Sequence, residues 1–235
     1  MTGSDRMTGR RIAFGAAFLL FLASSLWCAA ALSAESGEAR APDWSAALAS
    51  ADKRRGAEIA ANGANGGPPC RSCHGPAASR RPGLPRLAGL NAPYVARELF
   101  AFANGLRPDD EMRAATASLT PQDMADLGAY YESLRPAATA TAPAPGEGAR
   151  IHIDGVRGVM PCGQCHGVDA TGVTDDAPSL AGQEPAYVVK QLGAFAEGAR
   201  KSRSAMNDIA AKLSDEERAA LAQFYASLPP RGAAP

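Results

Sequence analysis

The sequence has few aromatic residues, few histidines and no net charge. Only 6% of its 235 residues are aromatic although 46% are hydrophobic, so alanine supplies much of the apolar content. Such a composition favours helices, but it leaves few large side chains to build a core unless a large apolar group fills it. The 24 basic and 24 acidic residues balance, and no basic run stands out. The chain therefore lacks the features of a nucleic-acid-binding protein.

Cysteine is also scarce, and its positions are informative. Cys28 lies in the N-terminal stretch, and the other four cysteines occur in two copies of the pattern Cys-x-x-Cys-His-Gly, at residues 70–75 and 162–167. Two thiols one helical turn apart can add to the two vinyl groups of a porphyrin, and the adjacent histidine can bind its iron. A single copy would also suit a thioredoxin-like redox pair. Two copies inside a longer repeat predict two covalently bound haem c groups, attached to Cys70, Cys73, Cys162 and Cys165.

Residues 1–34 have the three parts of an export signal. Arg6, Arg10 and Arg11 form a basic start, residues 12–26 are apolar, and small residues follow up to Ala34. We therefore expect cleavage near Ala34 and a periplasmic mature protein. Because the apolar stretch is near the lower limit for spanning a bilayer, an uncleaved membrane anchor stays open, as does association with the membrane surface.

An internal repeat organises the rest of the chain. The two cysteine motifs begin 92 residues apart, and residues 85–89 match residues 178–182 at an offset of 93. Further matches follow at similar offsets, up to a closing segment that contains Tyr131 in one copy and Tyr225 in the other. We predict a first domain at residues 35–135, a linker rich in Ala, Thr and Pro at 136–146, and a second domain at 147–235.

The periodicity within each copy predicts an all-α fold. Residues 91–105 place apolar side chains on one helical face, and Thr120 and Ser214 are suited to cap the last helix of each copy. A first helix is expected at residues 45–62. Its counterpart is less regular, because residues 149–154 alternate like a strand and only the repeat favours a helix there.

The repeat also selects the second ligand of each iron. An iron bound by histidine alone has an open position, and whether that position is closed separates an electron carrier from a catalyst. Met112 and Met206 are equivalent, since each lies seven residues before a matched leucine, whereas Met124 and Met160 have no counterpart. We predict that Met112 and Met206 lie in irregular stretches between helices and bind iron. The only other histidine, His152, is not repeated and is expected to be a surface or packing residue.

These motifs together resemble class I cytochrome c domains, and two in tandem behind a signal peptide resemble the dihaem cytochrome c4 family. The resemblance covers residues 45–230 and implies a small helical fold around each haem, with the first and last helices crossing. It implies His74 and His166 as proximal ligands and Met112 and Met206 as distal ligands. It also implies that the carbonyl groups of Pro85 and Pro178 accept hydrogen bonds from the proximal imidazoles.

The function expected from these features is single-electron transfer without catalysis by the chain itself. We expect a monomeric periplasmic carrier that moves electrons between a quinol-oxidising membrane complex and a terminal oxidase or reductase, and that docks transiently with redox proteins. Two alternatives stay open. The chain could be the cytochrome subunit of a flavin sulfide dehydrogenase or an alcohol dehydrogenase, or an enzyme such as a dihaem peroxidase or a thiosulfate-oxidising cytochrome.

Overall fold

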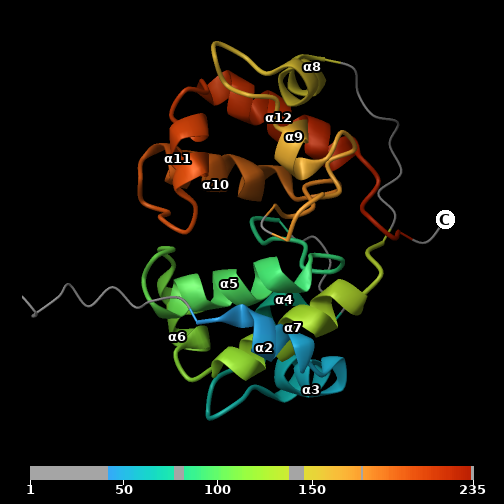
Figure 1. Cartoon of the computed structure of the whole chain (residues 1–235), viewed down its shortest axis with the longest axis vertical. Helices are drawn as coiled ribbons and strands as arrows, with labels where there is room; N and C mark the ends of the chain where they lie inside the picture. Colours follow the sequence, from blue (N-terminus) through green and yellow to red (C-terminus); the bar gives the residue numbers. More distant parts are fainter. Residues whose placement is uncertain (1–41, 77–81, 138–145, 176, 234–235) are drawn as a thin grey trace, which may run out of the picture. The chain divides into compact units, whose positions relative to one another are not determined.

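The computed structural model describes residues 42–76, 82–137, 146–175 and 177–233. Within these ranges every regular element is a helix, and the remaining residues form turns, loops and isolated bridge positions such as Val156 and Val159, so the all-α prediction is confirmed. The helices are α2 (Trp44–Ala49), α3 (Lys53–Asn62), α4 (Arg71–His74), α5 (Ala92–Ala103), α6 (Asp110–Thr116), α7 (Pro121–Ser133), α8 (Glu147–Asp154), α9 (Gly163–His166), α10 (Pro185–Ala196), α11 (Ser204–Ala210) and α12 (Asp215–Ser227) (Figure 1).

The contacts of the chain define a compact unit from Ala41 to Pro235. Within it we call residues 42–137, which contain α2 to α7, the first half, and residues 146–233, which contain α8 to α12, the second half. The predicted signal segment lies outside the described residues, as does most of the predicted linker. The domain boundaries at 35–135 and 147–235 therefore stay a prediction. None of the helices in the described ranges is long and apolar enough to cross a membrane.

In the first half, α3 and α5 both pack on α7. Their apolar faces form a core around Ile59, Tyr94, Leu127 and Tyr131. Thr120 caps the start of α7, as expected from the sequence, and it does so in a capping box: the Thr120 hydroxyl and the Asp123 carboxylate each accept a backbone N–H of the other residue. The cap stabilises the N-terminal end of α7, the helix on which both α3 and α5 pack.

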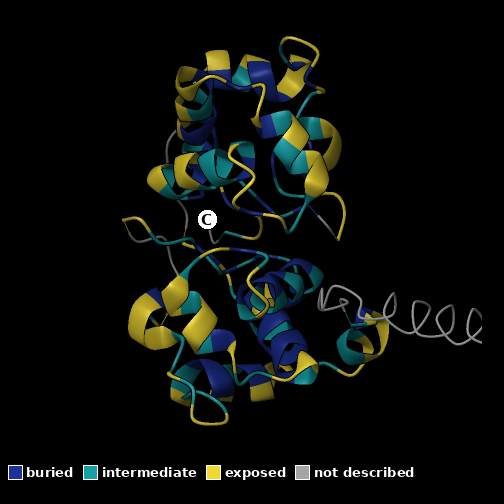
Figure 2. Ribbon diagram, turned by 90° about the vertical axis from the view of Figure 1, so that its left-hand side faces the viewer, coloured by how far each residue is buried: buried dark blue, intermediate teal, exposed yellow. Residues whose placement is uncertain are grey.

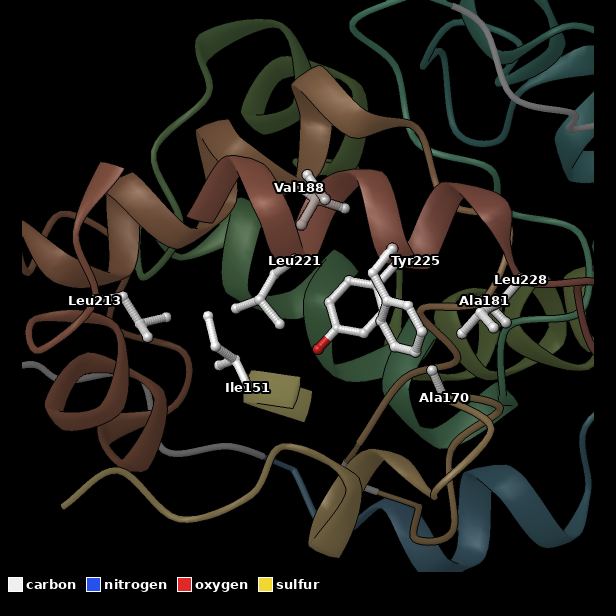
Figure 3. Packing of buried hydrophobic residues seen from close by; sticks show 10 residues of the cluster. Ile151, Ala170, Ala181, Val188, Leu213, Leu221, Tyr225 and Leu228 are labelled. Carbon is white, nitrogen blue, oxygen red and sulfur yellow. The ribbon is translucent and has the colours of Figure 1, made fainter. Parts of the chain in front are cut away.

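The second half repeats this plan. α8 and α10 both pack on α12, and Figure 3 shows Leu221 and Tyr225 of α12 beside Ile151 of α8, in the core of this half. Ser214 and Glu217 form the second capping box, as predicted. Figure 2 shows that the helices of both halves carry buried and exposed residues on different sides, as amphipathic helices do.

In each half the helix before the attachment turn, α3 or α8, meets the last helix at a glycine. A Cβ atom on Gly56 of α3 would lie 2.0 Å from the carbonyl oxygen of Asp126 in α7. A Cβ atom on Gly148 of α8 would lie 2.2 Å from the carbonyl oxygen of Ala220 in α12. Only glycine permits backbones to approach this closely, so these two residues set how tightly each helix pair can pack.

One prediction about helices was wrong. The expected first helix at residues 45–62 is divided into α2 and α3, because Asp52 leaves the helix and its carboxylate caps the new helix by accepting the Arg54 N–H at 2.8 Å. At residues 149–154 the helix favoured by the repeat is present as part of α8, and the strand-like alternation is not a guide to the structure. There the helix buries Ile151 and His152 together, and packing against α12 outweighs the local pattern.

Candidate haem-binding sites

Each cysteine motif folds as a single helical turn. In α4 the His74 N–H donates to the Cys70 carbonyl at 3.0 Å, and in α9 the His166 N–H donates to the Cys162 carbonyl at the same distance. The following glycine has a positive φ in both copies, 74° at Gly75 and 82° at Gly167, so the chain turns away directly after the histidine. This geometry holds the two cysteines and the histidine on adjacent positions of one short turn.

The first cysteine of each motif is less accessible than the second. Cys70 and Cys162 are half-buried, whereas Cys73 and Cys165 are exposed. Burial raises the pKa of the Cys70 and Cys162 thiols. The last helix of each half contributes to the core beside these thiols, since Cys70 packs against the cluster that contains Tyr131 and Cys162 packs against the cluster that contains Tyr225. The closing helix thus lies beside the attachment site.

The histidine of the second motif is held in one orientation. His166 is buried, and its Nδ1–H donates to the carbonyl oxygen of Pro178 at 3.0 Å. Burial lowers the pKa of this imidazole, so the ring is neutral at pH 7 and its Nε2 keeps a lone pair. His74 of the first motif is buried as well, and Pro85 is half-buried.

The two repeated methionines do not lie in irregular segments, contrary to the prediction. Met112 is in α6 and Met206 is in α11, each a helix of seven residues. The Asp109 carboxylate caps the start of α6 by accepting the Met112 N–H at 3.0 Å. The hydrogen-bonded backbone of a short helix holds the methionine Cα in a more fixed position than a loop would.

The other two methionines have different surroundings. Met124 is in the apolar core with Trp44 and Ala96. Met160 is 46% exposed and lies two residues before Cys162. Both settings are consistent with their lack of a counterpart in the repeat.

An apolar cavity of about 260 Å³ lies in the second half. His166 and Met206 both border it, together with the attachment cysteines, Pro178 and Met160. Its wall is completed by Leu180, Val188, Leu192, Phe195, Leu213, Leu221 and Tyr225, and by Leu90 and Tyr94 from the first half. The cavity thus brings together the residues that the sequence predicted for one haem.

His152 is a packing residue, and the alternative that it lies on the surface was wrong. Its side chain is fully buried between α8 and the last helix. Its Nε2–H donates to the Gly167 carbonyl at 2.8 Å, and the Tyr225 hydroxyl donates to its Nδ1 at 3.2 Å. His152 therefore joins α8 and α12 to the turn that follows the haem motif.

Comparisons with known proteins identify the family. A family model described as cytochrome c matches residues 155–229. A cytochrome c4 from Azotobacter vinelandii is 34% identical over 176 residues, which cover 68% of this chain and 84% of the relative. The chain belongs to the cytochrome c4 family. The fold agrees, because reduced recombinant cytochrome c4 from Pseudomonas stutzeri superimposes with a TM-score of 0.67 at 28% identity, over 76% of this chain and 99% of that one.

Two further relatives of this cytochrome c4 are named for thiosulfate oxidation. The thiosulfate dehydrogenase electron acceptor of Thiomonas intermedia (strain K12) is 34% identical over 170 residues, which cover 68% of this chain and 78% of the relative. A thiosulfate dehydrogenase from Marichromatium purpuratum matches 75% of this chain with a TM-score of 0.66 and 34% identity. This chain spans 40% of that larger protein.

The residues around the cavity fit the haem c that a cytochrome c domain carries. Two thiols on one turn can form thioether bonds, the oriented imidazole can bind iron, and the surrounding side chains are apolar. Such a haem supplies an iron that takes up and releases single electrons. The chain is thus a cytochrome c4-like electron carrier.

Several polar residues near the cavity could not be singled out from the sequence. Gln183 accepts the Arg86 N–H at 2.7 Å and donates back to the Arg86 carbonyl at 3.1 Å, which joins the two halves. Arg107 and Arg200 are buried between the halves with Glu98. Arg107 and Arg200 are equivalent in the repeat, which the sequence shows. The sequence near each arginine does not show that its side chain will be buried against a partner about 90 residues away.

Proposed function

We propose that this cytochrome c4 carries two haem c groups, one in each half, and transfers single electrons in the periplasm. Its partners would be a membrane complex that oxidises quinol and a terminal oxidase or reductase. The observation that carries the proposal is the repetition of the attachment turn, the buried histidine and the helix-borne methionine in both halves. A leader at residues 1–34 would account for export to that compartment.

The proposed axial ligands are His74 and Met112 in the first half and His166 and Met206 in the second. In the second half this is supported by a shared cavity, with His166 held by Pro178 and Met206 on the separate helix α11. An iron with both axial positions filled changes little in geometry when it is oxidised or reduced. A closed coordination sphere therefore favours fast electron transfer over binding of a substrate to iron.

A spectroscopic redox titration of the purified protein tests this function. The proposal expects two one-electron steps and low-spin iron in both oxidation states. A single step, or a high-spin iron in either half, would contradict it. Hydrogen peroxide reduction is the complementary measurement: turnover well above that of a monohaem carrier would support the dihaem peroxidase alternative instead.

A second candidate function is electron acceptor for a thiosulfate dehydrogenase. It is supported by two relatives that are named thiosulfate dehydrogenase electron acceptor and by the larger thiosulfate dehydrogenase that matches this chain. Stopped-flow measurement of the reduction of this protein by a thiosulfate dehydrogenase, with thiosulfate present, distinguishes the two candidate functions. Reduction within one turnover of that enzyme would favour this candidate, whereas reduction only by a quinol-oxidising complex would favour the first.

A further inference from the structure

A buried polar cluster lies between the two halves. It consists of Tyr94, Glu98 and Arg107 from the first half and Tyr187, Gln191 and Arg200 from the second. The side chains of Glu98, Arg107 and Arg200 are each at most 6% exposed. Burying charge is costly unless it is paired, so this arrangement has to be held together by its internal contacts.

The cluster is nearly symmetric because its members are equivalent in the repeat. Tyr94 and Tyr187, and likewise Arg107 and Arg200, are related by the same offset of 93 residues. The contacts are crossed: Arg107 donates to the Tyr187 hydroxyl at 2.6 Å, and Arg200 donates to the Tyr94 hydroxyl at 3.2 Å. Each guanidinium also lies over a phenylalanine of its own half, about 4 Å from the ring centre, and these two phenylalanines are again equivalent.

One position breaks the symmetry. Glu98 of α5 is equivalent to Gln191 of α10 at the same offset. Arg107 and Arg200 both donate to Glu98 Oε2, at 2.8 and 2.9 Å, and both donate to Gln191 Oε1, at 2.9 and 2.8 Å. The two halves thus present the same hydrogen-bonding geometry to the arginines, with a charged acceptor on one side and a neutral acceptor on the other.

Glu98 is ionised. Burial raises the pKa of its carboxyl group, but the two arginines more than offset this, so the pKa lies below its ordinary value. The cluster therefore contains one fixed negative charge, and that charge belongs to the first half.

Members of the cluster border the expected haem site of the second half. Gln191, Arg200, Tyr94 and Tyr187 all border the cavity that contains His166 and Met206. By the repeat, Glu98 occupies in the first half the place that Gln191 occupies in the second. A negative charge in a low-dielectric setting favours the oxidised, more positive state of a nearby iron, and its effect falls with distance. A carboxylate at this place should act more strongly on the first half than on the second.

We propose that Glu98 makes the two haem centres inequivalent by holding the first-half centre at a lower reduction potential than the second-half centre. This order of potentials directs an electron from the first-half centre to the second-half centre. In that step the ferrous iron of the first half becomes ferric, and the ferric iron of the second half becomes ferrous. This inference rests on the proposed two-haem function.

The test is a redox titration of the full holoprotein and two variants. Glu98→Gln gives both halves the same neutral acceptor and should raise the lower potential and narrow the separation between the two steps. Gln191→Glu should lower the second-half potential and also narrow the separation, and it tests the same idea if Glu98→Gln does not fold. Proton NMR of partly reduced protein assigns each step to its half, with Met206→Ala marking the second-half signals.

Glu58→Gln is the matched control, since Glu58 is an exposed carboxylate in the same half. Solvent screens its charge, so its removal should leave the separation nearly unchanged. An unchanged or wider separation in the folded Glu98→Gln protein, or in Gln191→Glu, overturns the inference. If the wild-type protein shows fewer than two one-electron steps, the two-haem function itself is overturned. If it shows two steps whose separation does not change in Glu98→Gln, only the role of Glu98 is overturned.

Discussion

At the scale of single residues, two methionines of the second half are candidates for the second iron ligand. Met206 and Met160 both border the second-half cavity. Met206 is in α11 and has an equivalent in Met112 of α6, whereas Met160 is unmatched and lies on the chain that leads into the attachment motif. Their positions in the repeat favour Met206 as the ligand opposite His166.

Replacement of Met206 tests this choice. Met206→Ala removes the proposed sulfur ligand of one iron, so the weak iron–sulfur absorption band in the far red should fall to about half its intensity. Met160→Ala is the matched control and should keep the full band. Loss of half the band in Met160→Ala, with a normal band in Met206→Ala, would assign the ligand to Met160 instead.

The residues that could be recognised from the sequence are those that repeat. The cysteines of the two motifs, the histidines and Met206 were all singled out because a second copy has the same residue at the same place. Glu98 and Gln191 were not found, because they differ between the copies. Their importance depends on meeting both arginines across the two halves, and such long-range contacts leave no local pattern in a single sequence.

At the scale of elements, the starts of the last helix in each half were predictable and the interrupted helix was not. Thr120 and Ser214 each begin a helix three residues before an acidic residue, and this short pattern is sufficient to form a capping box. The break between α2 and α3 depends on Asp52, whose backbone N–H donates to Asp126 of the distant helix α7. That contact is tertiary, so the local sequence reads as one continuous helix.

Removal of a cap should cost a predictable amount. In Ser214→Ala, α12 loses the hydroxyl that accepts the Glu217 N–H, and the free energy of unfolding should fall by about 1 kcal/mol. Ser214→Asp keeps an acceptor at this position and should retain most of the stability. Denaturant unfolding of the holoprotein measures both. Equal losses in the two variants would show that the hydroxyl is not acting as a cap.

The glycine contact between α8 and α12 should be far less tolerant. In Gly148→Ala the new methyl group would meet the Ala220 carbonyl oxygen, so the helices must separate, and we expect a loss on the order of 2–4 kcal/mol. Gly193→Ala in α10 is the control, because a Cβ atom there has no neighbour within 4 Å. That variant should gain up to about 1 kcal/mol from helix propensity. Similar effects of the two changes on chemical unfolding would refute the close approach.

At the scale of the whole molecule, the two halves are joined by polar contacts that respond to pH. The folded-state pKa of Glu98 lies below its ordinary value of 4.5. Its contribution to stability is therefore complete above that value and is lost as the pH falls through the lower folded-state pKa. At pH 7, Glu98→Gln should be less stable than the wild type by about 3 kcal/mol, because two buried arginines lose their carboxylate.

The pH dependence supplies the check. Unfolding free energies of the wild type and of Glu98→Gln, measured between pH 7 and pH 3, should converge below pH 4.5 as the wild-type carboxyl group is protonated. A stability difference that stays constant over this range would mean that the glutamine perturbs packing rather than removing a charge.

The contacts of Gly56 of α3 with α7 and of Gly148 of α8 with α12 affect when the haem pocket of each half can close. In each half the attachment turn lies between these two helices along the chain, so the pocket cannot close until the last helix has been delivered. A chain that crosses a membrane from its N-terminus would leave each pair of thiols accessible for the whole interval before its closing helix arrives. In a chain exported in this way, the order of the segments would leave an interval for haem attachment before α7 and α12 pack against Gly56 and Gly148.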